Sequence, residues 1–381
     1  MIRPDVFVDA LGGPAPFFAG VPDSLLKHFG THLAGALSPN QHVIAANEGA
    51  AVGLAIGHHL RTGEVPVVYL QNSGIGNAVN PLLSLADSEV YGIPLVLVIG
   101  WRGQPGVKDE PQHVKQGRVM TSLLHAMEIP FIVLPREEND ALTAARQARA
   151  DAVSTSGPVA ILVEAGTFEA AEAKPLPATT APGLPSREEA LVAFAEAVGQ
   201  TASVVCTTGM LGREMFEYRE QHPSTAVRDF LCVGGMGHAA SIAQGIALAD
   251  PTTDTWVFDG DGALLMHQGS LAVAAKSARP NLFHVVFNNG VHDSVGGQPT
   301  AIDQVDIPAL ALACGYRGSA TVHTCEAAES AVTAARATGG PYLIEVQVHP
   351  GNREGIGRPT RTPQNNKEAF MAALREDAAQ P

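Results

Sequence analysis

Apolar stretches of strand length recur along the first half of the chain, each followed by a stretch of helical character. They are almost uniformly apolar and do not alternate with polar residues, which is typical of strands buried on both faces of a parallel sheet. Strands are expected at 43–47, 65–72, 93–100, 130–135 and 158–165. Helices are expected over 48–60 and near 139–155, and another helix is expected to follow a polar loop through Lys115 and to end at 129. This alternation predicts α/β units joined by crossovers.

The second half repeats the plan. A helix is expected from Ser186 to Val198, because Ser186 and Glu189 three residues later form a capping box. Strands are expected at 203–209, 225–234, 255–262, 281–289, 317–323 and 341–348, with a short helix at 367–376. The chain therefore reads as two α/β halves of similar size.

Residues 170–186 are rich in Ala, Pro and Thr and carry no hydrophobic period, so they predict an extended linker. A chain of 381 residues is also too long for one comfortable hydrophobic core. We expect a first domain at 1–168, a linker at 169–186 and a second domain at 187–381, which includes a polar tail.

Composition places the chain among globular proteins, since 45% of residues are hydrophobic and 16% are charged. A net charge of −14 makes it a poor general binder of nucleic acid or anionic membranes. The longest apolar runs, such as 93–101, are too short to cross a bilayer, and no signal peptide is expected at the start. The four cysteines show no CxxC spacing. A cytoplasmic protein with reduced thiols is expected.

Two short polar motifs end neighbouring strands of the second half. Gly260-Asp261-Gly262 ends one strand and Asn288-Asn289 ends the next. Both should reach the carboxyl edge of one parallel sheet, where ligands usually bind. Oxygen side chains beside glycines suit a hard cation such as Mg²⁺ that shares phosphate oxygens. A tight turn and two loop-capping asparagines are the alternative interpretation.

The spacing of these motifs resembles the cofactor-binding pattern of thiamine-diphosphate-dependent enzymes. By that resemblance, Asp261 and Asn289 would bind Mg²⁺ through their side chains and Val291 through its backbone carbonyl. The segment around the first motif would bind the cofactor through Gly260, Gly262 and Ala263.

Glu48 directly follows an apolar strand and begins a helix. A glutamate there can simply complement the helix dipole, and this remains the alternative. By the resemblance, Glu48 would meet the ring nitrogen of the cofactor's aminopyrimidine and share a proton with it. The electron sink for decarboxylation belongs to the cofactor, and the protein supplies position and electrostatics.

Two further segments resemble parts of the same cofactor site. Met236 matches the bulky apolar residue that thiamine enzymes place beneath the cofactor, and the carbonyl of Gly234 matches the acceptor for its 4′-amino group. A Gly-rich helix entry with Met filling core space is the alternative. The second cofactor-binding loop would consist of Thr208, Gly209 and Met210.

Longer stretches, at 17–29, 101–118, 288–300 and 351–363, resemble the phosphonopyruvate decarboxylase family, with sulfopyruvate decarboxylases as its nearest relatives. The resemblance covers nearly the whole chain. It implies an α/β fold with two parallel-sheet domains, one pyrimidine-binding and one diphosphate-binding, and no middle domain. It also implies conversion of 3-phosphonopyruvate to phosphonoacetaldehyde and CO₂ in phosphonate biosynthesis, for example toward an antibiotic.

Basic residues gather in two of these stretches, although the protein as a whole is acidic. Arg and Lys are the expected partners of a phosphonate, and a solvated basic loop is the alternative. The residues expected to bind substrate are Arg102, Lys115, Arg118, Arg353 and Arg358. The candidates for proton transfer after decarboxylation are Asp23, Ser24, His113 and His292.

In members of the superfamily, the pyrimidine-binding half of one subunit faces the diphosphate-binding half of another. The resemblance therefore implies a homodimer or larger homo-oligomer in which Glu48 and Asp261 meet at a subunit interface. The expected substrate is a small anionic 2-oxoacid. Three alternatives stay open: a sulfopyruvate decarboxylase, an acetolactate-synthase-like carboligase, and a nucleotide-binding or structural α/β protein.

Overall fold

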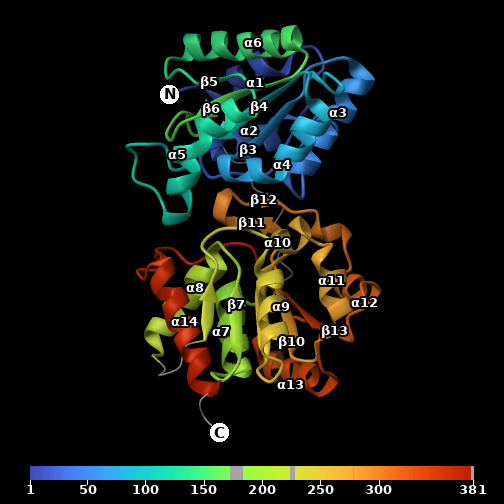
Figure 1. Cartoon of the computed structure of the whole chain (residues 1–381), viewed down its shortest axis with the longest axis vertical. Coiled ribbons are helices and arrows are strands. Elements are labelled where there is room, and N and C mark those ends of the chain that lie inside the picture. The colour runs from blue at the N-terminus through green and yellow to red at the C-terminus, as the bar shows by residue number, and fades with distance from the viewer. Residues whose placement is uncertain (172–182, 224–227, 278, 379–381) are drawn as a thin grey trace. The chain divides into compact units, whose positions relative to one another are not determined.

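The chain forms two compact units, Met1–Pro177 and Ala178–Pro381, each built around a six-stranded sheet (Figure 1). The computed structural model describes residues 1–171, 183–223, 228–277 and 279–378. Most of the predicted linker, 172–182, lies outside the described residues.

The first unit contains a parallel sheet in the order β2-β1-β3-β4-β6-β5. Its strands are β1 (Phe18–Gly20), β2 (His42–Ile44), β3 (Val67–Gln71), β4 (Leu95–Gly100), β5 (Phe131–Val133) and β6 (Pro158–Val163). Its helices are α1 (Pro4–Gly12), α2 (Lys27–Ala36), α3 (Glu48–Thr62), α4 (Ile75–Pro81), α5 (Pro111–Ala126) and α6 (Glu138–Thr155).

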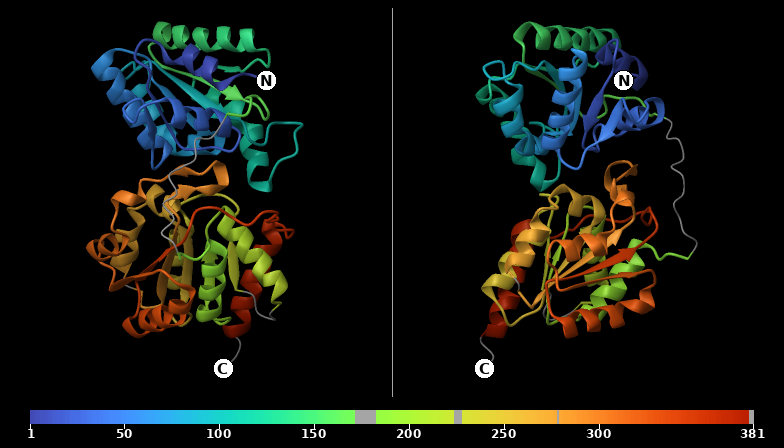
Figure 2. Two further views of the ribbon diagram at one scale, coloured as in Figure 1. Left: turned by 180° about the vertical axis from the view of Figure 1, so that it is seen from behind. Right: turned by 90° about the vertical axis from the view of Figure 1, so that its right-hand side faces the viewer.

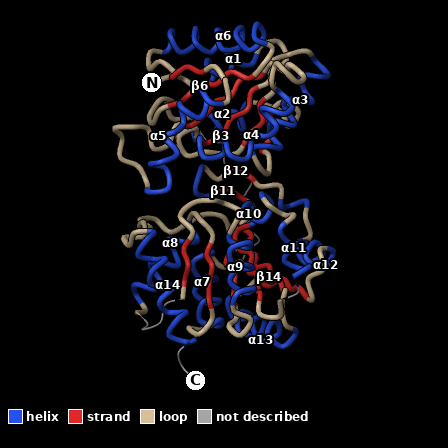
Figure 3. Tube along the Cα trace, viewed as in Figure 1, coloured by secondary structure: helices blue, strands red, loops and turns tan. Residues whose placement is uncertain are grey.

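Helices cover both faces of this sheet (Figures 1 and 3). Helices α1, α2 and α6 pack on one face, with the side chains of Val67 and Tyr69, and α3, α4 and α5 pack on the other, with Val68 and Leu70. Because successive side chains of a strand point to opposite faces, both sets are buried and the whole strand is apolar. The prediction of parallel strands buried on both faces is confirmed.

The second unit has the same architecture, with helices on both sides of its sheet (Figure 2). Its strand order is β13-β14-β10-β9-β7-β8. Its strands are β7 (Ser203–Cys206), β8 (Asp229–Leu231), β9 (Thr255–Gly260), β10 (Leu282–Asn288), β13 (Gly318–Val322) and β14 (Tyr342–Gln347), with a small antiparallel pair of β11 (Val291–His292) and β12 (Gln298–Pro299). Its helices are α7 (Arg187–Val198), α8 (Met210–Gln221), α9 (Ala239–Ala249), α10 (Asp261–Met266), α11 (Ser270–Ser277), α12 (Ile307–Ala313), α13 (Ala328–Thr338) and α14 (Pro363–Ala378).

Two buried clusters again sandwich the sheet, one with Trp256 and Phe258 beneath α7, α8 and α13, the other with Val257 beneath α9, α11 and α12. Strands β9 and β10 are parallel neighbours, with Phe287 opposite Gly260. Consequently the two polar motifs do lie at one edge of the sheet, as predicted. The capping box of Ser186 and Glu189 at the start of α7 is also confirmed.

Two helix starts differ from the sequence-based expectation. The polar loop expected to run through Lys115 ends at Glu110, and α5 begins at Pro111. The last helix begins at Pro363 and not at 367. Proline is favoured in the first turn of a helix, because its φ is already helical and its missing N–H is not needed there.

Candidate active site

Glu48 occupies the first turn of α3 in the first unit. The side chain of Asn47 caps this helix by accepting a hydrogen bond from the N–H of Ala50 at 2.9 Å. Glu48 is 6% exposed, and its Oε2 accepts a hydrogen bond from Nδ2 of Asn77 on α4 at 2.7 Å. Burial raises the pKa of Glu48, and the bond from Asn77 opposes that rise. Glu48 is thus a buried carboxyl suited to holding a proton.

Gly74, at the end of the helical turn Asn72–Gly74, lies directly against the carboxyl of Glu48. A Cβ added to Gly74 would lie 2.2 Å from Oε1 of Glu48. The φ of Gly74 is −72°, which any residue adopts, so the absence of a side chain is what matters here. Gly49 also has no space for a side chain, since a Cβ added to it would lie 2.8 Å from the carbonyl oxygen of Asn77. Small residues thus allow α3 and the Asn72–Pro81 segment to enclose Glu48.

Asp23 lies where β1, β3 and β4 end. It is 2% exposed, its Oδ1 accepts a hydrogen bond from Gln71 at 2.8 Å, and its Oδ2 accepts one from the N–H of Leu25 at 3.0 Å. A Cβ on Gly100 would lie 2.1 Å from Oδ2, so β4 passes very close to this carboxyl. Burial raises the pKa of Asp23 to about 6, and the charge of Arg102 opposes the rise.

Arg102 is held in one orientation by its neighbours. Its Nη1 donates to Oγ of Ser24 at 2.7 Å, while Nε and Nη2 donate to the carboxylate of Asp109 at 2.8 and 2.5 Å. The side chain of Asn72 clamps its backbone by hydrogen bonds of 2.8 and 3.1 Å. The structure therefore brings Asp23, Ser24 and Arg102 together, and Asp109 balances the charge of Arg102.

The other predicted residues of the 101–118 stretch lie on α5. A Cβ on Gly103 would lie 1.9 Å from the carbonyl of His113, so the backbone of His113 adjoins the residue after Arg102. Lys115 and Arg118 are exposed on the helix. The expectation that a polar loop through Lys115 carries these basic residues is therefore wrong, because α5 begins at Pro111 and includes Lys115 and Arg118.

Asp261 is the central acidic group of the second unit. It is 2% exposed, and its Oδ2 accepts a hydrogen bond from Oγ1 of Thr300 at 2.5 Å. Burial raises the pKa of Asp261 to about 6, while the bond from Thr300 and backbone N–H groups, including that of Asn289, oppose the rise. The β11–β12 hairpin brings Thr300 to this position. Thr300 lies at the end of the 288–300 stretch, and no role was predicted for it from the sequence.

Asn289 follows β10, next to Asp261. Its Oδ1 accepts a hydrogen bond from the N–H of Val291 at 3.1 Å, and its Nδ2 donates to Asp293 at 2.7 Å. A carboxylate, an amide oxygen and the nearby carbonyl of Val291 form a donor set that fits a hard cation such as Mg²⁺. Across the described ranges, no cluster of three or more His, Cys, Asp or Glu side chains offers another metal site.

Glycines leave open space beside the predicted cofactor loops. A Cβ added to Gly260 would meet no atom of the described residues within 4 Å, and one on Gly209 would first meet Oγ of Ser294 at 3.8 Å. Gly209, with φ of +106°, separates Thr208 from Met210, where α8 begins. This open backbone fits the close approach of a diphosphate.

Met236, Gly262 and His292 lie together. A Cβ on Gly262 would lie 2.8 Å from Cε1 of His292 and 3.3 Å from Cε of Met236. The turn that carries Gly234 and Met236 has two left-handed glycines, Gly235 and Gly237, and Ala263 is buried on α10. Burial lowers the pKa of His292 to about 4, so this ring is neutral at physiological pH. A neutral imidazole is a poorer proton donor than the sequence-based expectation required.

The tail arginines are placed differently from the residues above. Arg353 pairs with Glu188 at 3.0 Å and also with Glu217, while Arg358 is exposed. Two carboxylates of the same unit therefore already balance the charge of Arg353. The role of Arg353 and Arg358 in substrate binding stays a prediction.

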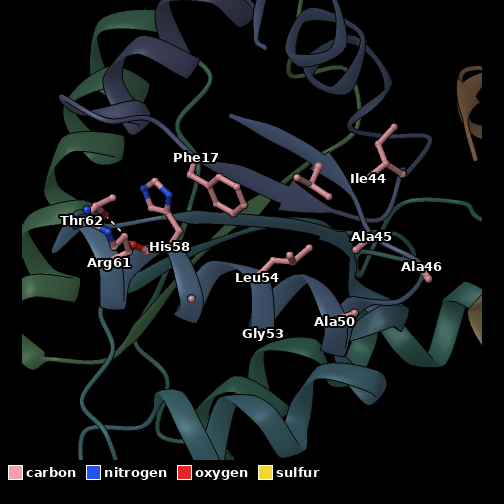
Figure 4. Close-up of a pocket in the computed structure, with 12 residues that line it drawn as sticks. Phe17, Ile44, Ala45, Ala46, Ala50, Gly53, Leu54, His58, Arg61 and Thr62 are labelled. Carbon is pink, nitrogen blue, oxygen red and sulfur yellow. Dashed lines mark hydrogen bonds between the residues drawn. The ribbon is translucent and has the colours of Figure 1, made fainter. Parts of the chain in front are cut away.

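An open groove of about 880 Å³ lies between β2 and α3 in the first unit (Figure 4). Its wall is mostly apolar, and the ring of His58 stacks on Phe17 with centroids 4.6 Å apart. Glu48 is not among the residues that line the groove. The groove therefore does not include the side chain of Glu48, although Ala46 and Ala50 on either side of it are lining residues.

Comparison with known proteins agrees with this geometry. Residues 16–122 match the N-terminal TPP binding domain of thiamine pyrophosphate enzymes, and residues 206–346 match their C-terminal TPP binding domain. A phosphonopyruvate decarboxylase of Streptomyces viridochromogenes is 37% identical over 372 residues, which cover 93% of this chain and 90% of that protein. The chain belongs to the phosphonopyruvate decarboxylase family of thiamine pyrophosphate enzymes.

Two further relatives are similar to the chain to different degrees. A phosphonopyruvate decarboxylase of Streptomyces hygroscopicus is 37% identical over 95% of this chain and 90% of its own length. A sulfopyruvate decarboxylase of Methanosarcina acetivorans is more distant, with 29% identity over 85% of each chain. The chain is thus a carboxy-lyase that uses thiamine diphosphate. Between β6, which ends at Val163, and α7, which begins at Arg187, there is no room for a middle domain.

The contact between Gly74 and Glu48 gives a first prediction. Gly74→Ala should lower kcat/KM for decarboxylation about 100-fold, because the added methyl group would displace Glu48, the predicted catalytic group, and a displacement of about 1 Å costs that much. Gly76→Ala is the matched control on the same segment, since its Cβ would meet no described atom within 4 Å. Steady-state CO₂ release and thermal unfolding of both variants check this. Equal activities in the two variants would contradict it.

Proposed function

We propose that the chain converts 3-phosphonopyruvate to phosphonoacetaldehyde and CO₂, with thiamine diphosphate and Mg²⁺ as cofactors, in phosphonate biosynthesis. The observation that carries the choice of substrate is the 37% identity to phosphonopyruvate decarboxylases over nearly the whole chain, against 29% to a sulfopyruvate decarboxylase. The reaction class rests on the family, and the site geometry supports a hard cation beside an open glycine-lined loop.

Each unit contributes its own part of the proposed mechanism. Thiamine diphosphate, when bound, supplies the electron sink that lets CO₂ leave. Asp261, Asn289 and the carbonyl of Val291 would hold Mg²⁺, and the open backbone at Gly209 and Gly260 would accept the diphosphate. Further cofactor contacts come from Thr208, Met210, Gly234, Met236, Gly262 and Ala263.

The carboxyl of Glu48 would exchange a proton with the ring nitrogen of the cofactor's aminopyrimidine. A carboxyl whose pKa is raised by burial exchanges a proton with a ring nitrogen at a smaller free-energy difference than an exposed one. The bond from Asn77 fixes the carboxyl plane, so the proton is held in one direction. This role requires a side chain that can gain and lose a proton at this atom.

Substrate recognition centres on Arg102. Asp109 holds the guanidinium in a fixed orientation, so little side-chain freedom is lost when it binds an anion. Asp23, with a pKa of about 6, is our preferred donor of the proton that replaces CO₂. Ser24 and His113 remain candidates for proton transfer, and Lys115 and Arg118 remain candidates for substrate binding. His292 is a weaker candidate for proton transfer, because burial lowers its pKa to about 4.

Release of CO₂ from phosphonopyruvate, sulfopyruvate and pyruvate, each with and without thiamine diphosphate and Mg²⁺, tests the proposal. We expect cofactor-dependent release with the highest kcat/KM for phosphonopyruvate. A higher value for sulfopyruvate would refute the substrate. Formation of an acyloin product in place of the aldehyde would support the carboligase alternative.

We also propose a homodimer or larger homo-oligomer whose active sites combine Glu48 of one subunit with Asp261 of another. Mixing Glu48→Gln and Asp261→Ala chains after dissociation should then restore about one quarter of the wild-type activity, because half of the dimers are mixed and each has one intact site. If both residues served the same chain's site, the mixture would stay inactive.

Within the described residues, no helix has the length and apolar character needed to span a bilayer. We propose a cytoplasmic location, which agrees with the four free cysteines.

A further inference from the structure

Asp293 lies four residues after Asn289, at the start of the helical turn Asp293–Val295. Its side chain is 10% exposed. Its Oδ2 accepts hydrogen bonds from Nη1 of Arg187 at 2.7 Å and from Nδ2 of Asn289 at 2.7 Å. The N–H of Gly351 approaches the same oxygen at 3.2 Å. Asp293 is thus a shared acceptor with no role in the mechanism so far.

Arg187 fixes the position of Asp293 through a buried ion pair. The side chain of Arg187 is 6% exposed, and that of Glu214, its second partner, is 1% exposed. Nε and Nη2 of Arg187 donate to Glu214 at 2.9 and 2.8 Å, which leaves Nη1 for Asp293. A guanidinium fixed by two carboxylates cannot rotate away without leaving a buried charge unpaired. The position of Asp293 is therefore set by α7 and α8.

The amide of Asn289 has two ends of nearly equal size, and only one of them can bind a cation. Because Nδ2 donates to Asp293, Oδ1 is the end that faces away from Asp293, where it accepts from the N–H of Val291. A flipped amide would present two N–H donors to the proposed cation in place of an oxygen. The hydrogen bond to Asp293 excludes that flip.

We propose that Asp293 is a positioning residue for the metal site: it directs the amide oxygen of Asn289 toward the cation, and Arg187 keeps Asp293 in place. This inference rests on the Mg²⁺ site of the proposed function. A free carboxylate two residues from Val291 would also compete as a ligand for a hard cation. The hydrogen bonds from Arg187 and Asn289 occupy Oδ2 of Asp293, so this oxygen orients Asn289 and does not itself bind the cation. Partners around a metal site commonly orient its ligands in this way.

The test measures metal affinity and not turnover. Free Mn²⁺ is followed by electron paramagnetic resonance in the full-length protein with saturating thiamine diphosphate, and Mg²⁺ affinity is obtained by competition. Asp293→Ala should weaken binding about 10–100-fold, the usual effect of removing a partner that orients a metal ligand. Asp293→Asn keeps an acceptor oxygen for Nδ2 of Asn289 and should recover most of the affinity.

Asp229→Ala is the matched control. Asp229 belongs to another buried ion pair of the same unit, with Arg219 at 2.6 Å, and its side chain is 3% exposed. It should lower the thermal stability of the cofactor-free protein to a similar extent and leave Mn²⁺ affinity unchanged. Wild-type affinity in Asp293→Ala, or an equal loss in Asp229→Ala, would overturn the inference. Failure of the wild-type protein itself to bind Mn²⁺ would overturn the metal site and the inference with it.

Discussion

Glu48→Gln should lower kcat for decarboxylation by about 100-fold or more, the usual contribution of a positioned acid or base. Glutamine keeps the size of the side chain and an oxygen for the hydrogen bond from Asn77, but it cannot exchange a proton. Binding of thiamine diphosphate should change little, because the predicted diphosphate and metal contacts belong to the second unit. Single-turnover CO₂ release and calorimetric titration of the cofactor measure the two effects separately.

Glu64→Gln is the control for this experiment. Glu64 lies in the same unit, where it pairs with Arg149 at 3.1 Å, and it carries no predicted role. Glutamine keeps an oxygen that can accept the bond from Nη2 of Arg149, and Nη1 of Arg149 still donates to the carbonyls of Leu11 and Val65, so this variant should resemble the wild type. Activity of Glu48→Gln within a few-fold of the wild type would reject the proton-transfer role.

Asp261→Ala should weaken the Mg²⁺-dependent binding of thiamine diphosphate by about 100-fold or more, an effect at least as large as that of losing an outer partner of a metal site. Among the three proposed protein ligands, Asp261 is the only one with a charge. Its removal also leaves Oγ1 of Thr300 without its acceptor, which costs about 1–3 kcal/mol of stability. Calorimetric titration of the cofactor at fixed Mg²⁺ gives the affinity.

Asp250→Ala provides the comparison. Asp250 follows α9 in the same unit and accepts a hydrogen bond from Thr252 at 2.6 Å, in an exposed turn. It should leave cofactor affinity unchanged. Unaltered affinity in Asp261→Ala would mean that the cation, if bound, is held elsewhere.

The features predicted correctly from the sequence are local ones. Uniformly apolar strands and strand-end glycines are visible within a few residues, and they were enough to predict the two sheets and the shared edge of Asp261 and Asn289. The short strand β1 was not predicted, because its three residues, Phe18–Gly20, are too few to show a hydrophobic pattern. In the structure β1 lies between β2 and β3.

The contacts that orient the candidate groups could not be predicted, since they join residues far apart in the chain. Arg187 and Asp293 are 106 residues apart, and Asn77 and Glu48 are 29 apart. The close approach of Gly74 to Glu48 likewise depends on how two helical segments pack. Spacing along one sequence carries no information about such pairs.

The basic residues show another limit of prediction from the sequence. The positive charges of Arg102 and Arg353 are evident from the sequence, but their ion pairs with carboxylates of the same unit are not. Acidic residues outnumber basic ones, 38 to 24, so most arginines can find a carboxylate. A sequence shows where positive charges occur but not which of them are already neutralised.

The shared edge of β9 and β10 has a consequence for the lifetime of the protein. Asp261 and Asn289 become neighbours only when these two strands are paired, so the unfolded chain lacks the binding site. A ligand that binds only the folded state shifts the unfolding equilibrium by mass action, by about 2.7 kcal/mol at a hundred times its Kd. The supply of vitamin-derived cofactor in a cell would then govern how much of this protein escapes proteolysis, as well as how fast it works.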